Sequence, residues 1–241
     1  YAQETKDAFP EDPRTQLRQA VRAVFQSWNN PRAVTYRRLN EVPHRLGTAV
    51  LVQSMVFGNM GLASFAGVVF TRNPGDGTNE LYGEYLINSQ GVDLAQGART
   101  PRSIRHMPEE QLEEYDDEQM DLNRKEANWI YRRLFGEIQE LKEKIEAQFD
   151  DMQDVEFTVQ EGTLHVLQSR PGERTASAAV KVAVDMVNEG LIDVQTAVLR
   201  VKADQVEHLL NQQFEPKDKA RAEDKGRLLA TGLPASPGVC V

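Results

Sequence analysis

The stretch that decides the fold is MQDVEFTVQEGTLHVLQSR, residues 152–170. It contains two runs in which apolar and polar residues alternate, and the pair Glu161-Gly162 separates the two runs. Alternation with a period of two is typical of a half-buried strand, and a glycine-containing turn between two such runs favours a β-hairpin. We therefore expect an antiparallel hairpin over residues 152–170.

The pairing register of this hairpin has two solutions. A three-residue loop with Gly162 in the left-handed conformation gives two polar pairs, Glu156 with Gln168 and Asp154 with Arg170. A two-residue loop gives three other pairs, Val155 with Gln168, Phe157 with Val166 and Val159 with Leu164. Because a slip of one residue moves every side chain to the other face, the choice matters. The apolar pairs favour the second register, and the chemistry of the polar pairs favours the first.

The polar residues of the hairpin suggest a site for a metal ion and phosphate. In the first register two carboxylates lie beside an amide and a guanidinium. Carboxylate and amide oxygens suit Mg²⁺, and arginine pairs with phosphate oxygens. The alternative is an exposed hairpin face with a cross-strand ion pair, and the pattern alone leaves both interpretations open.

The rest of the chain reads as further helices and strands. Hydrophobic spacing and end signals predict helices over 14–28, 122–149, 175–188, 193–201 and 203–210, with a shorter helix beginning at Pro31. Apolar runs predict strands over 48–57, 65–71 and 81–87, the first of them buried. Residues 88–102 show no clear periodicity and are predicted to form a long loop.

The charge of the chain excludes some classes of partner. The 241 residues carry a formal net charge of -9, and residues 108–121 contain eight acidic residues and no basic one. This balance argues against nucleic acid and against an anionic membrane as partners. No apolar stretch approaches the roughly 18 residues of a spanning helix. We expect the acidic segment to be a solvated helix face, and the polar residues 1–13 to contain no signal peptide.

Other reactive residues give weaker signals. Cys240 is the single cysteine, which excludes an internal disulfide and a cysteine-based metal site. The four histidines have no ligand spacing, so we expect no zinc site. Arg72 follows a predicted strand and is interpreted as a surface arginine, with a phosphate contact as the alternative.

Several long strings of this sequence resemble pyruvate, phosphate dikinases. They are VQSMVFGNMG at 52–61, GVVFTRNP at 67–74, YGEYLINSQG at 82–91, DMQDVEFT at 151–158 and FQSWNNPRA at 25–33. The resemblance covers nearly the whole chain. It implies a partial ATP-grasp fold of the α+β class, a mainly antiparallel sheet with packed helices, followed by a helical linker.

The resemblance also implies a division into four parts. Residues 1–57 would come from the first part of the ATP-grasp domain, and 58–172 would be its C-terminal subdomain with the hairpin. Residues 173–230 would form the helical linker, and 231–241 would begin a phosphohistidine domain. We therefore expect an incomplete fragment of the enzyme, inactive alone and weak in ATP binding.

The activity implied by the resemblance is the conversion of ATP, phosphate and pyruvate to AMP, pyrophosphate and phosphoenolpyruvate, through a phosphohistidine on a swivelling domain. Mg²⁺ would be the cofactor, ATP and phosphate the ligands, and the intact enzyme a cytoplasmic homo-oligomer. The residues implied are Glu156 and Gln168 for the metal, Gln168 and Arg170 for catalysis, Asp154 in the same cluster, and Gln53, Met55 and Val56 for the nucleotide.

Three alternatives remain beside this interpretation. The chain could belong to a phosphoenolpyruvate synthase or to an antibiotic phosphotransferase, or it could be a non-catalytic nucleotide-sensing module. The strings Phe-Gly-Asn-Met-Gly at 57–61 and Asp-Met-Gln-Asp at 151–154 favour the dikinase.

Overall fold

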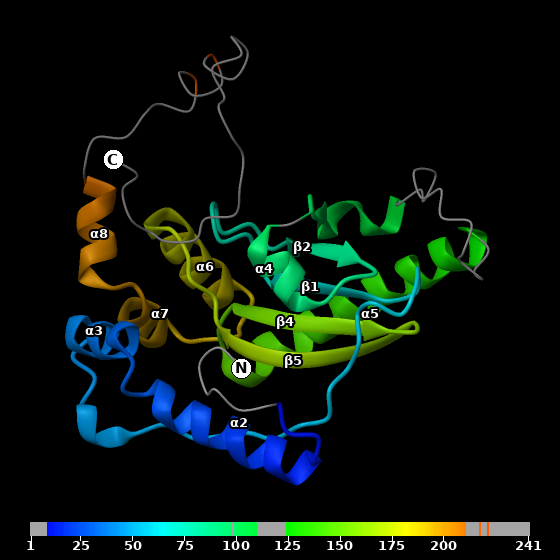
Figure 1. Ribbon diagram of the computed structural model, residues 1–241. Coiled ribbons are helices and arrows are strands. Elements are labelled where there is room, and N and C mark those ends of the chain that lie inside the picture. Colours follow the sequence, from blue (N-terminus) through cyan, green and yellow to red (C-terminus); the bar gives the residue numbers. More distant parts are fainter. Residues whose placement is uncertain (1–8, 98, 110–123, 211–216, 218–220, 222–241) are drawn as a thin grey trace. The chain divides into compact units, whose positions relative to one another are not determined.

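The computed structural model describes residues 9–97, 99–109, 124–210, 217 and 221. The chain divides into two compact units, Tyr1–Met55 and Val56–Val241, which are described in turn (Figure 1).

The first unit contains two helices and a short 3-10 helix. They are α2 (Pro13–Ser27), α3 (Pro31–Leu39) and η1 (His44–Leu46). The Asp12 carboxylate accepts from Thr15 N–H at 2.8 Å, and the Asn30 side chain accepts from Ala33 N–H at 2.8 Å. Both side chains satisfy backbone donors that a helix start leaves free. The two helices and the start at Pro31 confirm the prediction.

Arg37 holds this unit together. Its side chain is buried, and its guanidinium lies 3.9 Å from the centre of the Trp28 ring. Nη1 donates to the Trp28 carbonyl at 2.5 Å, and Nε donates to Nδ1 of His44 at 3.1 Å. One arginine thus joins α2, α3 and η1.

The predicted strand over 48–57 is wrong. The structure gives residues 47–57 no helix or strand, and Leu51, Val52 and Met55 are largely exposed. A strand needs a neighbour for its backbone N–H and C=O groups, and within the described residues none pairs with this segment.

The second unit is built on a five-stranded antiparallel sheet in the order β3-β2-β1-β4-β5. The strands are β1 (Phe65–Phe70), β2 (Tyr82–Ile87), β3 (Arg102–Ser103), β4 (Gln153–Gln160) and β5 (Thr163–Pro171). The predicted strands over 65–71 and 81–87 and the hairpin are confirmed. The α+β class and the antiparallel sheet with packed helices are confirmed as well.

Helix α5 (Arg124–Phe149) runs along one face of the sheet (Figure 1). Its stripe of Leu134, Ile138 and Ile145 joins Phe65 and Phe157 of the sheet in the main core. The long helix predicted from this stripe is confirmed.

Helix α6 (Ala176–Asn188) packs on the opposite face. Its Val182 and Met186 form a second core with Phe70 of β1. Since Val69 belongs to the main core and neighbouring side chains of a strand alternate, the two cores lie on opposite faces. The short helices α7 (Val194–Arg200) and α8 (Ala203–Leu210) follow, as predicted.

The predicted long loop over 88–102 contains regular structure. Helix α4 (Gly91–Gln96) lies within it, and strand β3 and the 3-10 helix η2 (Ile104–Glu109) follow. The Asp93 carboxylate accepts from the Gln90 backbone N–H at 3.0 Å and from the Ser89 hydroxyl at 2.9 Å, and these bonds lower the pKa of Asp93. A helix of six residues carries too little periodicity to be recognised from sequence.

Several expectations concern residues outside the described part of the chain. They include most of the acidic segment (110–121), Cys240, most of the charged linker beyond Leu210, and residues 231–241. Among the described residues, every helix is too short or too polar to cross a membrane.

Candidate functional site

The hairpin adopts both of the predicted registers, one in each half. The turn is the two-residue Glu161-Gly162, with φ values of 49° and 79°. Two central residues with positive φ are the preferred geometry of a tight hairpin, which explains the glycine. Next to the turn, Val159 pairs with Leu164 and Phe157 with Val166. This half therefore follows the apolar register.

The pairing then shifts by one residue between Phe157 and Glu156. Leu167 is the extra residue of β5, which makes this irregularity a β-bulge. Beyond it, Glu156 pairs with Gln168 and Asp154 with Arg170. The polar pairs expected from the three-residue loop form without that loop.

The four polar residues lie on the face of the sheet opposite α5. Arg170 Nε donates to Asp154 Oδ2 at 2.8 Å, and Arg170 Nη2 lies 3.8 Å from Glu156 Oε1. Asp154 is buried, whereas the Arg170 and Glu156 side chains are 54% and 41% exposed. The hydrogen bond and the charge of Asp154 raise the pKa of Arg170. The Nε atom of Arg170 is thus bonded to Asp154, while much of the side chain remains exposed to solvent.

Glu84 belongs to the same row, although the sequence reasoning did not select it. Val68 of β1 pairs with Glu84 on one side and with Glu156 on the other. Directly paired residues share a face, so the two carboxylates flank Val68. Burial raises the pKa of Glu84. An acidic residue inside an otherwise apolar strand was the available signal.

The neighbouring rows of this face are covered. Phe70 packs against α6, and Ala66 and Leu86 are buried at the other end. Between them, Val68 and Glu84 are half-buried. The open strip of the sheet is therefore the row of Glu84, Val68 and Glu156, and the pair of Asp154 with Arg170 lies in the next row, beside Phe70.

The predicted adenine segment lies across the boundary of the two units. Gln53 and Met55 are exposed residues of the first unit, and Val56 is a half-buried residue of the second. Next to Val56, the Phe57 N–H donates to Gln160 Oε1 at 2.8 Å. The end of the segment is thus fixed to β4, on the turn side of the carboxylates.

The donor set fits a metal ion that is shared with a ligand. Among the described residues, no three or more His, Cys, Asp or Glu side chains gather closely enough to hold a metal alone. Glu156 and Gln168 nevertheless offer a carboxylate and an amide oxygen from paired positions. Mg²⁺ in phosphate-binding sites takes one or two carboxylates and completes its shell with phosphates and water.

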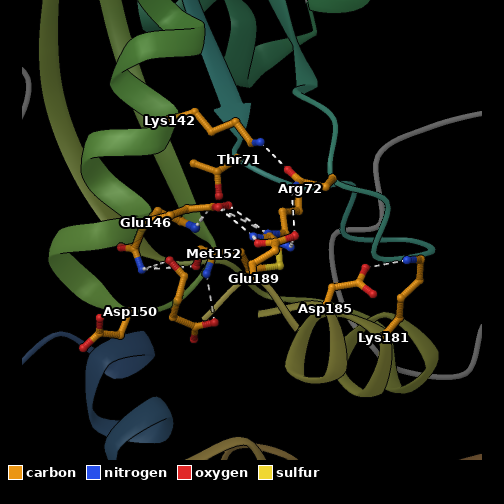
Figure 2. A network of polar contacts seen from close by, with 12 residues as sticks. Thr71, Arg72, Lys142, Glu146, Asp150, Met152, Lys181, Asp185 and Glu189 are labelled. Atoms are coloured by element: carbon orange, nitrogen blue, oxygen red, sulfur yellow. Dashed lines mark hydrogen bonds and ion pairs between the residues drawn. The ribbon is translucent and has the colours of Figure 1, made fainter. Parts of the chain in front are cut away.

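Arg72 is neither a surface residue nor free to contact phosphate. It is fully buried, and its Nη2 lies 2.9 Å from Glu146 of α5 and 2.5 Å from Glu189 at the end of α6 (Figure 2). Burial alone would lower the pKa of Arg72, but the hydrogen bonds that it donates to Glu189 and Glu146 raise the pKa above its ordinary value. The guanidinium of Arg72 is thus bonded to two carboxylates. The predicted surface position and the alternative, a phosphate contact, are both wrong.

The antiparallel sheet with its helices and its open acidic strip defines a class of protein, a partial ATP-grasp-like domain. Residues 9–191 match the family described as pyruvate phosphate dikinase, AMP/ATP-binding domain. The chain belongs to this family, and the resemblance seen in its sequence is confirmed.

The chain is also similar to individual proteins that are named as pyruvate, phosphate dikinases. The chain is 46% identical over 241 residues to pyruvate, phosphate dikinase, chloroplastic, of Flaveria trinervia. It is 44% identical over 232 residues to pyruvate, phosphate dikinase of Clostridium symbiosum, and 44% identical over 241 residues to pyruvate, phosphate dikinase 2 of Zea mays. These matches cover 100%, 96% and 100% of this chain, but only 23%, 24% and 25% of the relatives.

Proposed function

We propose that this chain is the ATP-binding part of a pyruvate, phosphate dikinase. The intact enzyme would transfer the β-phosphate of ATP through a phosphohistidine to pyruvate, with AMP, pyrophosphate and phosphoenolpyruvate as products. The observation that carries the proposal is the two cross-strand pairs of polar residues at the open strip, Glu156 opposite Gln168 and Asp154 opposite Arg170. Family membership and the names of the relatives support it.

In this proposal each of the paired residues has its own role. Glu156 and Gln168 hold Mg²⁺, which when bound neutralises charge on the phosphates. Arg170 stabilises negative charge that develops on the transferred group, the main requirement in phosphoryl transfer. Asp154 keeps the Arg170 guanidinium in place through the 2.8 Å hydrogen bond. Glu84 adds a third carboxylate to the strip.

Backbone groups of Gln53, Met55 and Val56 would bind the adenine edge. The contact of Phe57 with Gln160 supports a role for Val56, because it fixes the end of that segment to β4, the strand that also contains Asp154 and Glu156.

The remaining parts of the proposal rest on the family. Phosphate and a phosphohistidine domain of the same enzyme would be the partners, and the intact enzyme would be a homo-oligomer. A cytoplasmic location is our expectation, although several relatives are named as chloroplastic.

The test uses an intact dikinase that contains this sequence, incubated with labelled ATP, Mg²⁺ and phosphate. We expect AMP, pyrophosphate and an acid-labile phosphoenzyme. If the reaction needs no added phosphate, the dikinase assignment fails. In the same enzyme, Glu156→Gln should abolish the ATP half-reaction and spare phosphorylation by phosphoenolpyruvate. Loss of both half-reactions would indicate misfolding and would not support a role for Glu156 at the ATP site.

A further inference from the structure

A buried amide lies directly before the site residue Asp154. Gln153 is 2% exposed, and its Nε2 donates to the carbonyls of Met152 at 3.1 Å and Asp151 at 3.3 Å. Its Oε1 accepts from the Ser169 hydroxyl of β5 at 3.1 Å. The side chain therefore has partners for both its donor and its acceptor, as a buried polar group requires.

The backbone of Gln153 is fixed by the end of β1. Its N–H donates to Thr71 Oγ1 at 2.9 Å, and its carbonyl accepts from Thr71 N–H at 2.9 Å. Thr71 lies directly before Arg72, whose guanidinium is held between two carboxylates (Figure 2). Gln153 thus keeps its position independently of β5.

The bond between Gln153 and Ser169 depends on the register of β5. In the observed register Ser169 pairs with Val155, which puts Ser169 on the same face as Gln153. If the register of the turn continued to the strand end, Ser169 would lie opposite Asp154, on the other face. The buried Oε1 of Gln153 would then lose its partner, which carries a large penalty.

We propose that Gln153 is a positioning residue that selects the shifted register through Ser169. By this bond it places Gln168 and Arg170 opposite Glu156 and Asp154. The turn sets one register and the buried amide sets the other, and the bulge at Leu167 absorbs the difference. The consequence for ATP rests on the proposed function, whereas the effect on the register does not.

The first test measures the register directly in the 241-residue chain by NMR, as cross-strand contacts of Asp154 with Arg170. Gln153→Met keeps the side-chain length and removes the hydrogen bonds, and Ser169→Ala removes the hydroxyl. We expect both variants to lose the 154–170 contacts and to gain 154–169 contacts. Ser169→Thr, which keeps a hydroxyl, should retain the native pattern.

The matched control is Gln160→Met, at the other end of the same strand. It removes an amide of the same size whose partner is Phe57 and not β5. The 154–170 contacts should stay unchanged in this variant. If they also stay unchanged in Ser169→Ala, a conservative change expected to leave the chain folded, the positioning role is excluded.

The second test measures the ATP half-reaction in the intact dikinase. A displacement of reacting groups by about 1 Å can cost about 100-fold in rate. Because a slip of one residue moves Gln168 and Arg170 to the other face, we expect a loss of at least this order in Ser169→Ala, with phosphorylation by phosphoenolpyruvate unchanged and Ser169→Thr active. If the register changes but the half-reaction does not, Gln153 positions β5 and the proposed role of the hairpin is wrong. If the half-reaction falls without a register change, the positioning inference is wrong.

Discussion

Glu189 lies at the C-terminal end of α6, where the helix dipole disfavours a negative charge. Arg72 compensates for this placement with two hydrogen bonds, and Asn79 adds a third. The bond from Arg72 is the main cause of the lowered pKa of Glu189. A residue that is unfavourable for its helix is therefore stabilising for the tertiary structure.

This ion pair predicts a pH dependence of stability. Because the pKa of Glu189 is lower in the folded state, its contribution is present above the ordinary glutamate pKa and is lost as the pH falls through the lowered value. The side chain is 34% exposed, so we expect Glu189→Gln to cost about 1–2 kcal/mol at neutral pH. Thermal melts of both proteins should converge in acid. An equal difference at every pH would contradict the ion-pair explanation.

Arg170 yields a second prediction at the scale of one residue. Arg170→Lys keeps the charge, but it replaces the planar fork of five donors, one of which bonds Asp154, with a compact ammonium that cannot reproduce this geometry toward phosphate. We expect the ATP half-reaction of an intact dikinase to fall by about 100-fold, in the range seen for loss of one transition-state donor. The melting temperature should change little, since the side chain is 54% exposed. A variant with near-normal activity would show that charge alone suffices.

At the scale of the element, the bulge of β5 decides which side chains reach the open strip. Residues 164–166 follow the register of the turn, and residues 168–171 follow the register set beyond it. A search for strict alternation with a period of two cannot predict this change of register, because one extra residue exchanges the two faces of the strand. Either register alone would misplace one half of the hairpin.

Deletion of Leu167 tests this directly. Without the extra residue the turn register extends along β5 and itself places the residues now numbered 168 and 170 opposite Glu156 and Asp154, with no bulge. We therefore expect the deletion to retain the Asp154–Arg170 contact and the Mg·ATP response, because the two registers then coincide. Leu167→Ala, which keeps the extra residue, is the control and should retain the contact. If the deletion abolishes the contact in a chain that stays folded, the bulge does more than absorb the difference between the two registers.

At the scale of the whole molecule, the described part of the site contains few cations for a nucleotide. Arg170 faces the strip, whereas Arg72 is taken up by two carboxylates. The net charge of -9 adds a general repulsion of anions, of which residues 108–121 carry most. In the proposed site, the described residues therefore offer Mg·ATP mainly the metal ligands Glu156 and Gln168 and the guanidinium of Arg170.

We therefore expect weak binding of Mg·ATP by the 241-residue chain. Calorimetry should give a dissociation constant of about 1 mM or weaker, the range of a ligand with few directed contacts. Raising the salt concentration should screen the repulsion between exposed charges and improve or leave unchanged the affinity. Binding in the low micromolar range would show that these residues alone make a sufficient site.

Short-range patterns in the sequence predict most of the helices and strands and suggest the residues of the proposed site. The caps at Asn30 and Thr175, the stripe of α5 and the turn at Gly162 follow from short-range rules of hydrogen bonding and hydrophobic spacing. The four polar residues of the hairpin were also selected from their strand positions, and the resemblance to dikinases was carried by contiguous strings.

Three features could not be predicted from the sequence: the burial of Arg72, the absence of a strand over residues 48–57 and the two-part register of the hairpin. Each depends on partners distant in sequence. Arg72 is buried because Glu146 and Glu189 converge on it, and residues 48–57 form no strand because none of the described strands lies alongside. The register shifts because β1 fixes Gln153 from outside the hairpin, and no pattern within residues 152–170 contains that contact.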